Sequence, residues 1–516
     1  MPKKSVDKWQ FGDFQTPIDL ARKVVEVLKR NHDIQPDIVI EPTCGKGAFV
    51  RASYEGFNES RILGFEINPQ YVEEAKTSLE PTSSIERVEI EEADFFSTEW
   101  DKIISENDGY VLVIGNPPWV TSSELSLLNS KNLPEKNNFQ NRKGIEAITG
   151  SANFDISEWM LLQHVKWLSK RKGAIAFLCK YAVARKVMRQ VRKSPEHRFF
   201  CHIYPIDAKA YFDASVEACL FVLTTDIGNA DCEVYESLDS IQPSYIIGER
   251  NGFIVSDVKK YEKWKLLRGQ DPKYIWRSGV KHDCSQIMEL EPLNGGYRNG
   301  LGEIINFEDD YIYPLLKSSD IGNGRIESFR KAVLITQKFV GEDTSSIKNT
   351  APITWNYLVE HRKYLDNRRS SIYKNKPEFS VFGIGDYSFK KWKIAISGLY
   401  KKLRFNLVGS LNEKTVLFDD TVNFLSFDTE QEALFIFHLV TSAPALHFLE
   451  SMIFWDEKRP LTIQILRRLS LREVAVELGE IVQYKYWAQV QTPNLAGQME
   501  LGIAEDKSKY KAYAIS

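Results

Sequence analysis

Short apolar runs that alternate with segments of helical periodicity dominate the chain between about residues 17 and 226. Residues 18–29 and 156–170 repeat apolar side chains at helical spacing, and Asn68-Pro69 is a helix-start signal. Such alternation predicts an α/β fold built on a seven-stranded, mainly parallel sheet. The predicted strands are residues 38–40, 62–67, 88–93, 110–114, 173–179, 199–206 and 219–224.

After about residue 226 the alternation stops, and aromatic residues, glycine turns and short β-like stretches follow. Helical pieces are expected near residues 355–370 and 430–454. We therefore predict two domains, residues 1–235 and residues 236–516, the second with a mixed α+β fold. The polar segment 121–153 is typical of a long loop over a site.

Composition excludes several classes of protein. Hydrophobic residues make up 43% and charged residues 27% of the chain, as in ordinary globular proteins, which argues against disorder or a fibrous fold. The six cysteines stand apart without zinc-ligand spacing, so we expect a reduced, cytoplasmic protein without a metal. A polar N-terminus and interrupted apolar stretches predict neither a signal peptide nor a membrane segment.

A glycine-containing turn directly follows the first predicted strand. Glycines at a strand-to-helix turn let the backbone approach a ligand, and an acid ending the next strand, here Glu66, suits a ribose. A plain tight turn is an equal alternative, and Cys44 is compatible with a small core residue. Glu41 would repel a pyrophosphate and favours a cationic ligand such as S-adenosylmethionine. The turn is Glu41-Pro42-Thr43-Cys44-Gly45-Lys46-Gly47-Ala48-Phe49.

A second motif, Asn116-Pro117-Pro118-Trp119, follows the fourth predicted strand. Two prolines fix the backbone and remove donors, which directs an amide side chain and carbonyl groups at one point. The side-chain oxygen of Asn116 and the carbonyl oxygen of Pro117 could accept the two hydrogens of an exocyclic amine. The lone pair of the amine nitrogen would then be free to attack a sulfonium methyl group. Trp119 offers a stacking face. A simple Asx-Pro turn would account for Asn116-Pro117 alone, but it accounts less well for the complete four-residue motif.

Together and in this order, the motifs resemble those of gamma-class N6-adenine DNA methyltransferases of type II restriction-modification systems, the class similar to the TaqI methylase. The resemblance covers roughly residues 11–225 and includes Phe14-Gln15-Thr16-Pro17 and Ala93-Asp94-Phe95. It implies a Rossmann-like catalytic domain, S-adenosylmethionine as cofactor and a target-recognition domain after it. The residues implied to hold the cofactor are Thr16, Glu41, Pro42, Thr43, Cys44, Gly45, Gly47, Glu66, Ile67, Asp94, Phe95, Pro118 and Phe154.

The same resemblance assigns catalysis to the tetrapeptide Asn116 to Trp119. The target adenine of double-stranded DNA would leave the helix and stack on Trp119 and Phe212. Many relatives have Tyr or Phe where this chain has Trp119. Phe212 is matched only by its spacing before the last strand, so a core position remains its alternative. Phe154 is equally typical of a hydrophobic staple at a helix start.

The formal net charge of -3 conceals two basic segments. Residues 166–198 contain eleven Lys and Arg against one acid, and residues 362–404 contain twelve against three acids. We predict that the two segments form opposing walls of a DNA-binding cleft. Each basic run alone is also typical of a solvated face, and the aromatic residues of the second segment are also typical of the core of a β domain. The predicted DNA contacts are Arg185, Lys186, Arg189, Arg368, Arg369, Lys390, Lys391 and Lys393.

Two other functions remain open from the sequence. One is a methyltransferase that acts on a protein glutamine or an RNA base, which a long C-terminal extension disfavours. The other is a non-catalytic DNA-binding subunit on a methylase fold, which the intact tetrapeptide disfavours. The favoured hypothesis is a monomer on DNA with a cognate restriction endonuclease as a further partner. The recognition sequence depends on side-chain geometry and is not predicted.

Overall fold

The computed structural model describes residues 14–79, 85–120, 155–193, 199–225 and 231–489. The chain divides into two compact units, Met1–Val258 and Lys259–Ser516. This boundary lies later than the predicted 235/236, because the strands Tyr245–Arg250 and Phe253–Val255 still belong to the sheet of the first unit.

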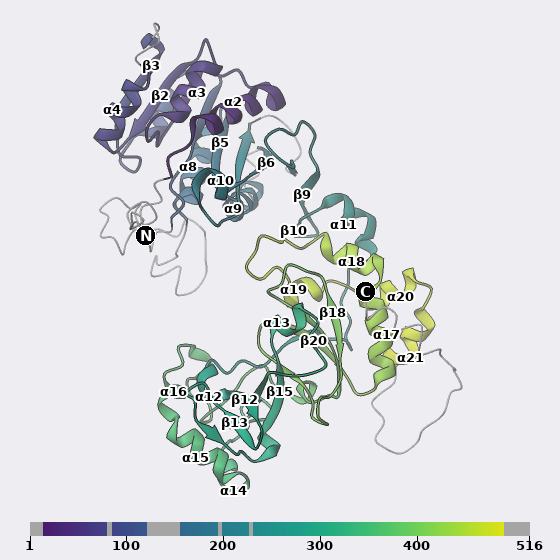
Figure 1. The fold of residues 1–516 in the computed structure, drawn as a ribbon. Coiled ribbons are helices and arrows are strands. Elements are labelled where there is room, and N and C mark those ends of the chain that lie inside the picture. The colour runs from purple at the N-terminus through teal and green to yellow at the C-terminus, as the bar shows by residue number, and fades with distance from the viewer. Residues whose placement is uncertain (1–13, 80–84, 121–154, 194–198, 226–230, 490–516) are drawn as a thin grey trace. The chain divides into compact units, whose positions relative to one another are not determined.

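The first unit is an α/β domain built on one sheet (Figure 1). The strand order is β10-β9-β8-β6-β7-β5-β4-β1-β2-β3, in which β3, β2, β1, β4 and β5 run parallel and β7 is antiparallel to its neighbours β5 and β6. Its strands are β1 (Ile38–Glu41), β2 (Arg61–Glu66), β3 (Val88–Glu92), β4 (Val111–Gly115), β5 (Gly173–Lys180), β6 (Phe200–Ile206), β7 (Ala218–Thr224), β8 (Cys232–Val234), β9 (Tyr245–Arg250) and β10 (Phe253–Val255). Its helices are α2 (Ile18–His32), α3 (Ala48–Gly56), α4 (Pro69–Thr77), α5 (Trp100–Ser105), α8 (Ile156–Leu168), α9 (Tyr181–Lys193) and α10 (Ala208–Phe212).

All seven predicted strands form, and their ends agree with the prediction to within one residue. The predicted number of strands is nevertheless wrong, because β8, β9 and β10 extend the sheet to ten strands within the described residues. These added strands follow one another without intervening helices, and β9 exposes Tyr245 and Ile246. They therefore lack the alternation of strands with helices that identified the other seven.

Side chains that alternate along the central strands pack against helices on two faces of the sheet. Leu112 and Ile114 of β4 join a core cluster with Val24 of α2 and Phe49 of α3. On the opposite face, the ring of Phe177 in β5 lies 5.3 Å from that of His164 in α8, measured between centroids. This arrangement leaves the carboxyl ends of the parallel strands accessible as a site.

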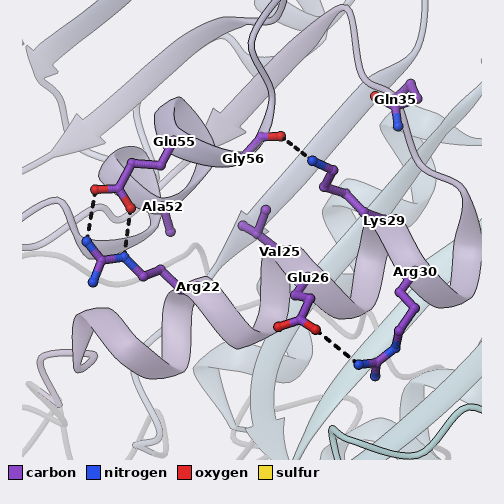
Figure 2. Close-up of a pocket in the computed structure, with 9 residues that line it drawn as sticks. All are labelled: Arg22, Val25, Glu26, Lys29, Arg30, Gln35, Ala52, Glu55 and Gly56. Atoms are coloured by element: carbon purple, nitrogen blue, oxygen red, sulfur yellow. Dashed lines mark hydrogen bonds and ion pairs between the residues drawn. The ribbon is translucent and has the colours of Figure 1, made fainter.

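Helix α2 is fixed against α3 by packing and by charge pairs. Its buried Leu20, Val24 and Leu28 recur at helical spacing. Figure 2 shows a hollow on the outer side, where Arg22 donates to both carboxylate oxygens of Glu55 (2.7 and 3.0 Å) and Lys29 Nζ donates to Gly56 O (2.8 Å). These contacts hold α2, and with it the segment 14–17 that precedes the helix.

The second unit contains two sheets with the orders β14-β13-β12-β16-β15-β19 and β11-β20-β17-β18, a mixed α+β fold as predicted. Its strands are β11 (Arg277–Ser278), β12 (Glu289–Leu293), β13 (Gly296–Arg298), β14 (Ile304–Ile305), β15 (Ile312–Leu316), β16 (Lys331–Leu334), β17 (Trp392–Ser397), β18 (Phe405–Val408), β19 (Leu417–Phe418) and β20 (Val422–Phe427). Its helices are α11 (Val258–Trp264), α12 (Ser285–Met288), α13 (Ser318–Gly322), α14 (Ile347–Thr350), α15 (Pro352–Glu360), α16 (Arg362–Asp366), α17 (Glu430–Thr441), α18 (Ala443–Glu450), α19 (Ile463–Leu466), α20 (Leu471–Glu477) and α21 (Ile481–Gln489).

Both helical pieces predicted in this unit are broken into pairs. The first becomes α15 and α16, and the second becomes α17 and α18, with Ser442 between them and Pro444 in the first turn of α18. No single helix of the described ranges is long and apolar enough to cross a membrane, whereas α17 and α18 reach that length and composition only as a pair bent by 57°.

One lysine lies inside the four-stranded sheet. Lys393 of β17 is 1% exposed and its Nζ donates to Lys390 O at 2.7 Å. The prediction that Lys393 contacts DNA is therefore wrong, since its ammonium group does not reach the surface. Burial lowers the pKa of Lys393 to about 7, because the apolar surroundings disfavour the charged form.

This burial predicts a pH dependence of stability. Between pH 7 and the ordinary pKa of 10.5, the unfolded chain binds the Lys393 proton and the folded chain does not. Stability therefore rises with pH across that window. Lys393→Met should remove this rise and raise the free energy of unfolding at neutral pH by on the order of a few kcal/mol. Urea unfolding at several pH values measures both, with the exposed neighbour Lys391→Met as control. Equal pH profiles for the wild type and Lys393→Met would contradict the prediction.

Candidate active site

The carboxyl ends of three neighbouring parallel strands bring the predicted site residues together. In the order β2-β1-β4, Glu41 of β1 lies opposite Gly64 of β2, and Ile40 opposite Val113 of β4. Glu41, Glu66 and Asn116 thus leave the sheet at one edge, although they are far apart in the sequence.

The glycine turn has a backbone that only glycine adopts easily. Gly45 and Gly47 have φ values of +50° and +80°. A Cβ on Gly47 would lie 2.9 Å from the Cβ of Ala75 in α4. The turn is held open by two side chains: Glu66 Oε2 accepts from Gly45 N (2.8 Å), and Gln15 Oε1 accepts from Lys46 N (3.0 Å).

Glu41 is buried beneath this turn. It is 2% exposed, and its Oε2 accepts from Val50 N of α3 at 2.8 Å. Burial, together with the nearby charge of Glu66, raises the pKa of the Glu41 carboxyl well above its ordinary range. A cationic group bound beside Glu41 would favour its ionised form, so the structure agrees with a ligand of positive charge.

The other residues of the turn leave polar atoms available. Thr43 Oγ1 is buried and has no hydrogen-bond partner within the described residues. Glu66 accepts from Gly45 N and Asn68 N through different carboxylate oxygens, and each oxygen retains a second lone pair for a hydroxyl group. Next to it, the side chain of Ile67 is 49% exposed, an apolar surface suited to a flat ring.

The remaining predicted cofactor residues are placed less uniformly. Thr16 is half-buried, and Cys44 and Pro42 are buried at the turn. Asp94 Oδ1 accepts from Phe96 N at 2.9 Å. Phe95 is 6% exposed and its ring packs against Trp100, so its side chain belongs to the core, and its backbone oxygen accepts from Trp100 Nε1 at 2.8 Å. Phe154 and the predicted loop 121–153 lie outside the described residues.

The amide of Asn116 is fixed in one orientation. Its Nδ2 donates to the backbone oxygen of Phe14 at 3.0 Å, which requires the nitrogen to be on that side because a carbonyl only accepts. Its Oδ1 is buried without a hydrogen-bond partner among the described residues. A buried acceptor left unsatisfied costs free energy unless a donor arrives, so Oδ1 is suited to an amine ligand.

Three aromatic rings lie together beside this amide. The ring centroids of Trp119 and Phe212 are 5.3 Å apart, and Phe14 lies 5.5 Å from Trp119 and 6.0 Å from Phe212. Phe212 follows β6, whose carboxyl end is at the same edge as that of β4. Trp119 is 5% exposed and its Nε1 donates to Leu178 O (3.2 Å), so a base reaches its face only if a neighbouring ring moves.

Sequence reasoning missed two contributors to this site, Phe14 and Gln15. Both belong to the motif Phe14 to Pro17, in which the family resemblance assigns a role to Thr16 alone. The motif itself indicates both residues, because the Phe14 ring and the Gln15 amide directly precede α2, whose start lies at the same sheet edge. Their contacts to Asn116 and Lys46 depend on the tertiary packing of α2.

The predicted DNA contacts divide into surface and interior residues. Arg185 is 4% exposed and, like Lys393, cannot reach a phosphate. Lys186 pairs with Glu158 (2.9 Å) and Lys390 with Asp428 (2.8 Å). Arg368 donates to Ser380 O and lies over the ring of Tyr373 at 3.7 Å. Arg189, Arg369 and Lys391 are exposed.

Comparison with known proteins identifies the chain. A family model described as N-6 DNA Methylase matches residues 4–260. The Type II methyltransferase M.NspV of Nostoc sp. (strain ATCC 29411 / PCC 7524) is 44% identical over 471 residues, which cover 91% of this chain and 98% of that protein. The chain belongs to the type II DNA methyltransferases. This membership favours DNA over a protein glutamine or an RNA base as the substrate.

Two further likenesses accompany this assignment. The Type II methyltransferase M.CvrRI of Paramecium bursaria Chlorella virus XZ-6E is 36% identical over 110 residues, covering 21% of this chain and 25% of that protein. The solved structure of the type IIL restriction-modification enzyme MmeI in complex with DNA has a TM-score of 0.50 and 14% identity. It covers 93% of this chain and 70% of that protein, and it shows a similar fold.

The cofactor of this methyltransferase is S-adenosylmethionine, and the turn suits it. Glu41 offers a carboxylate for the positive charge, Glu66 offers acceptors for the ribose, and Thr43 Oγ1 needs a partner. Exposed Ile67 offers a surface for the adenine ring. Groups of three or more His, Cys, Asp or Glu arranged to hold a metal ion are absent from the described part of the chain.

The buried carboxyl of Glu41 predicts that cofactor binding releases a proton. Its pKa is raised in the free protein, and a bound sulfonium or ammonium group lowers that pKa again. Affinity for S-adenosylmethionine should therefore rise with pH above the ordinary carboxyl range, until the free protein itself loses the Glu41 proton. Titration calorimetry in buffers of different ionisation enthalpy measures the release directly.

Glu41→Gln keeps an acceptor for Val50 N and should flatten this pH dependence. Glu74→Gln is the matched control, because Glu74 is an exposed carboxylate on α4 that pairs with Lys46 of the same turn (2.7 Å). Proton release that persists in Glu41→Gln would assign it to another group.

Proposed function

We propose that the protein transfers the methyl group of S-adenosylmethionine to N6 of adenine in double-stranded DNA, as the modification enzyme of a restriction-modification system. The observation that carries this proposal is the buried Oδ1 of Asn116, which has no hydrogen-bond partner among the residues that the structure describes. It lies at the carboxyl end of β4 and at the same sheet edge as the cofactor turn. The family model, described as N-6 DNA Methylase, supports adenine as the base.

In the proposed mechanism, Asn116 acts on the amine that becomes methylated. An exocyclic amine is a poor nucleophile because its lone pair is delocalised into the aromatic ring. Asn116 Oδ1 and the Pro117 carbonyl accept its two hydrogens, which holds the nitrogen with its lone pair free. S-adenosylmethionine, when bound, would supply the electrophilic methyl group, and its sulfur would leave as the neutral thioether while the amine loses one of its two hydrogens as a proton. Phe14 O keeps the amide oriented through Nδ2, so no reorganisation is required during the reaction.

A buried acceptor of this kind implies that the target base leaves the duplex. Asn116 Oδ1 is enclosed by protein atoms, so an adenine stacked within a DNA helix cannot reach it. Extrusion of a base costs a few kcal/mol. Stacking of the extruded base among Trp119, Phe212 and Phe14 would offset this cost, with displacement of one ring of the group.

The second unit is proposed to recognise the target sequence. M.NspV matches this chain over nearly its whole length, so that type II methyltransferase shares a segment of this size after the catalytic unit. Arg369 and Lys391 expose cationic side chains in the second unit and are proposed phosphate contacts. We further propose that the protein acts in the cytoplasm as a monomer on DNA, beside a cognate restriction endonuclease.

Asn116→Ala tests the mechanism. It should reduce methyl transfer by about 10²- to 10³-fold, the effect of removing one oriented polar group from a site, while S-adenosylmethionine and DNA still bind. Transfer of tritiated methyl groups to plasmid DNA measures the rate. Asn31→Ala is the matched control, because Asn31 Nδ2 donates to Tyr204 OH and Ser240 O at the other end of α2. Near-normal turnover by Asn116→Ala would refute the mechanism.

Sequencing of plasmid DNA from cells that express the protein tests the base and the target sequence together. N6-methyladenine at one recurring sequence is expected. N4-methylcytosine would leave the proposed role of Asn116 intact and overturn adenine as the base. Unmodified DNA would return the non-catalytic subunit as the better hypothesis.

A further inference from the structure

Two arginines of the second unit converge on one buried acid. The Asp320 side chain, in α13, is 7% exposed, and its Oδ1 lies 2.6 Å from Arg330 Nη2 and 3.7 Å from Arg325 Nη2. Arg325 Nη2 also donates to Ser319 O at 3.2 Å. The side chains of Arg325 and Arg330 are nevertheless 52% and 63% exposed, so both guanidinium groups are oriented by the protein and accessible to solvent.

A third arginine joins them from a distant part of the sequence. Arg404, directly before β18, lies over Gly324, where an added Cβ would be 2.4 Å from Arg404 Nη2. Gly324 has a φ of +69°. Two bonds hold the segments together: Asn323 Nδ2 donates to Tyr400 OH (3.1 Å), and Asn406 Nδ2 donates to Ile321 O (3.0 Å). Because Gly324 has no side chain, the Arg404 guanidinium can lie directly against its backbone.

The charge of this surface is not balanced. Residues 319–330 and 400–404 together contain five Lys or Arg and two acids, Asp320 and Glu327. Asp320 can neutralise one of the arginines that it orients, so positive charge remains in excess. Arginine presents planar, bidentate donors that match the oxygens of a phosphodiester. When the guanidinium groups are oriented in advance, less side-chain conformational entropy is lost on binding.

We propose that Arg325, Arg330 and Arg404 form an arginine clamp for the phosphodiester backbone of DNA. The clamp deepens the proposed function of the second unit and rests on it. Arg325 and Arg330 lie outside the two basic segments of the sequence, and only the tertiary contacts around α13 unite them with Arg404. Asp320 is a positioning residue, which orients two guanidinium groups without touching DNA.

The double variant Arg325→Gln/Arg404→Gln tests the clamp and keeps the Arg330–Asp320 ion pair intact. Binding to a fluorescein-labelled duplex of about 30 base pairs is measured over a series of salt concentrations. Each phosphate contact contributes about 0.9 to the slope of log affinity against log salt, so the slope should fall by about 2. Affinity at moderate salt should fall roughly 10- to 100-fold. Affinity for S-adenosylmethionine and turnover at saturating DNA should not change, whereas the KM for DNA should rise.

The control is Arg298→Gln/Arg472→Gln, which removes two exposed arginines elsewhere in the same unit, each paired with a glutamate. Gly324→Ala is an independent variant that keeps every charge and displaces Arg404, and it should lower the slope by about 1. A slope equal to that of the control in both clamp variants would overturn the clamp. A wild-type protein that binds duplex DNA without salt dependence would instead contradict the proposed function itself.

Discussion

The parallel hydrogen-bonded register of β2, β1 and β4 is the constraint on which the site depends. It places the ends of three strands at one edge, so that Glu66, Glu41 and Asn116 meet there. Each side chain also makes a hydrogen bond to the backbone: Glu66 accepts from Gly45 N, Glu41 accepts from Val50 N, and Asn116 donates to Phe14 O. The residues that we propose to serve the reaction are therefore also the residues that shape the surrounding turns.

Much of the first unit could be predicted from the sequence because its signals are local. Buried strands such as β1, β4 and β5 are continuous apolar runs, and all seven predicted strands have ends correct to one residue. The same dependence explains what was missed. Strands β8 and β10 have three residues each, and β9 exposes apolar side chains such as Ile246. Their pairing is therefore decided by the neighbouring sheet edge rather than by their own sequence.

The site was predictable as a set of residue types, but not as a set of contacts. Asn116 and the glycine turn are recognisable because their chemistry needs those residues in that order. That Phe14 O fixes the Asn116 amide, or that Phe95 packs into the core, depends on side-chain packing. Charge was the least informative signal: Arg185 and Lys393 are buried within basic runs, whereas Arg325 and Arg330 gather outside them.

Phe14 divides two requirements of the site between its backbone and its side chain. The carbonyl group holds Asn116, while the phenyl ring covers Trp119. A rotation about the Cα–Cβ bond moves the ring and leaves the carbonyl where it is. In the proposed mechanism, admission of the target base and alignment of the Asn116 amide are therefore mechanically independent, although a single residue governs both.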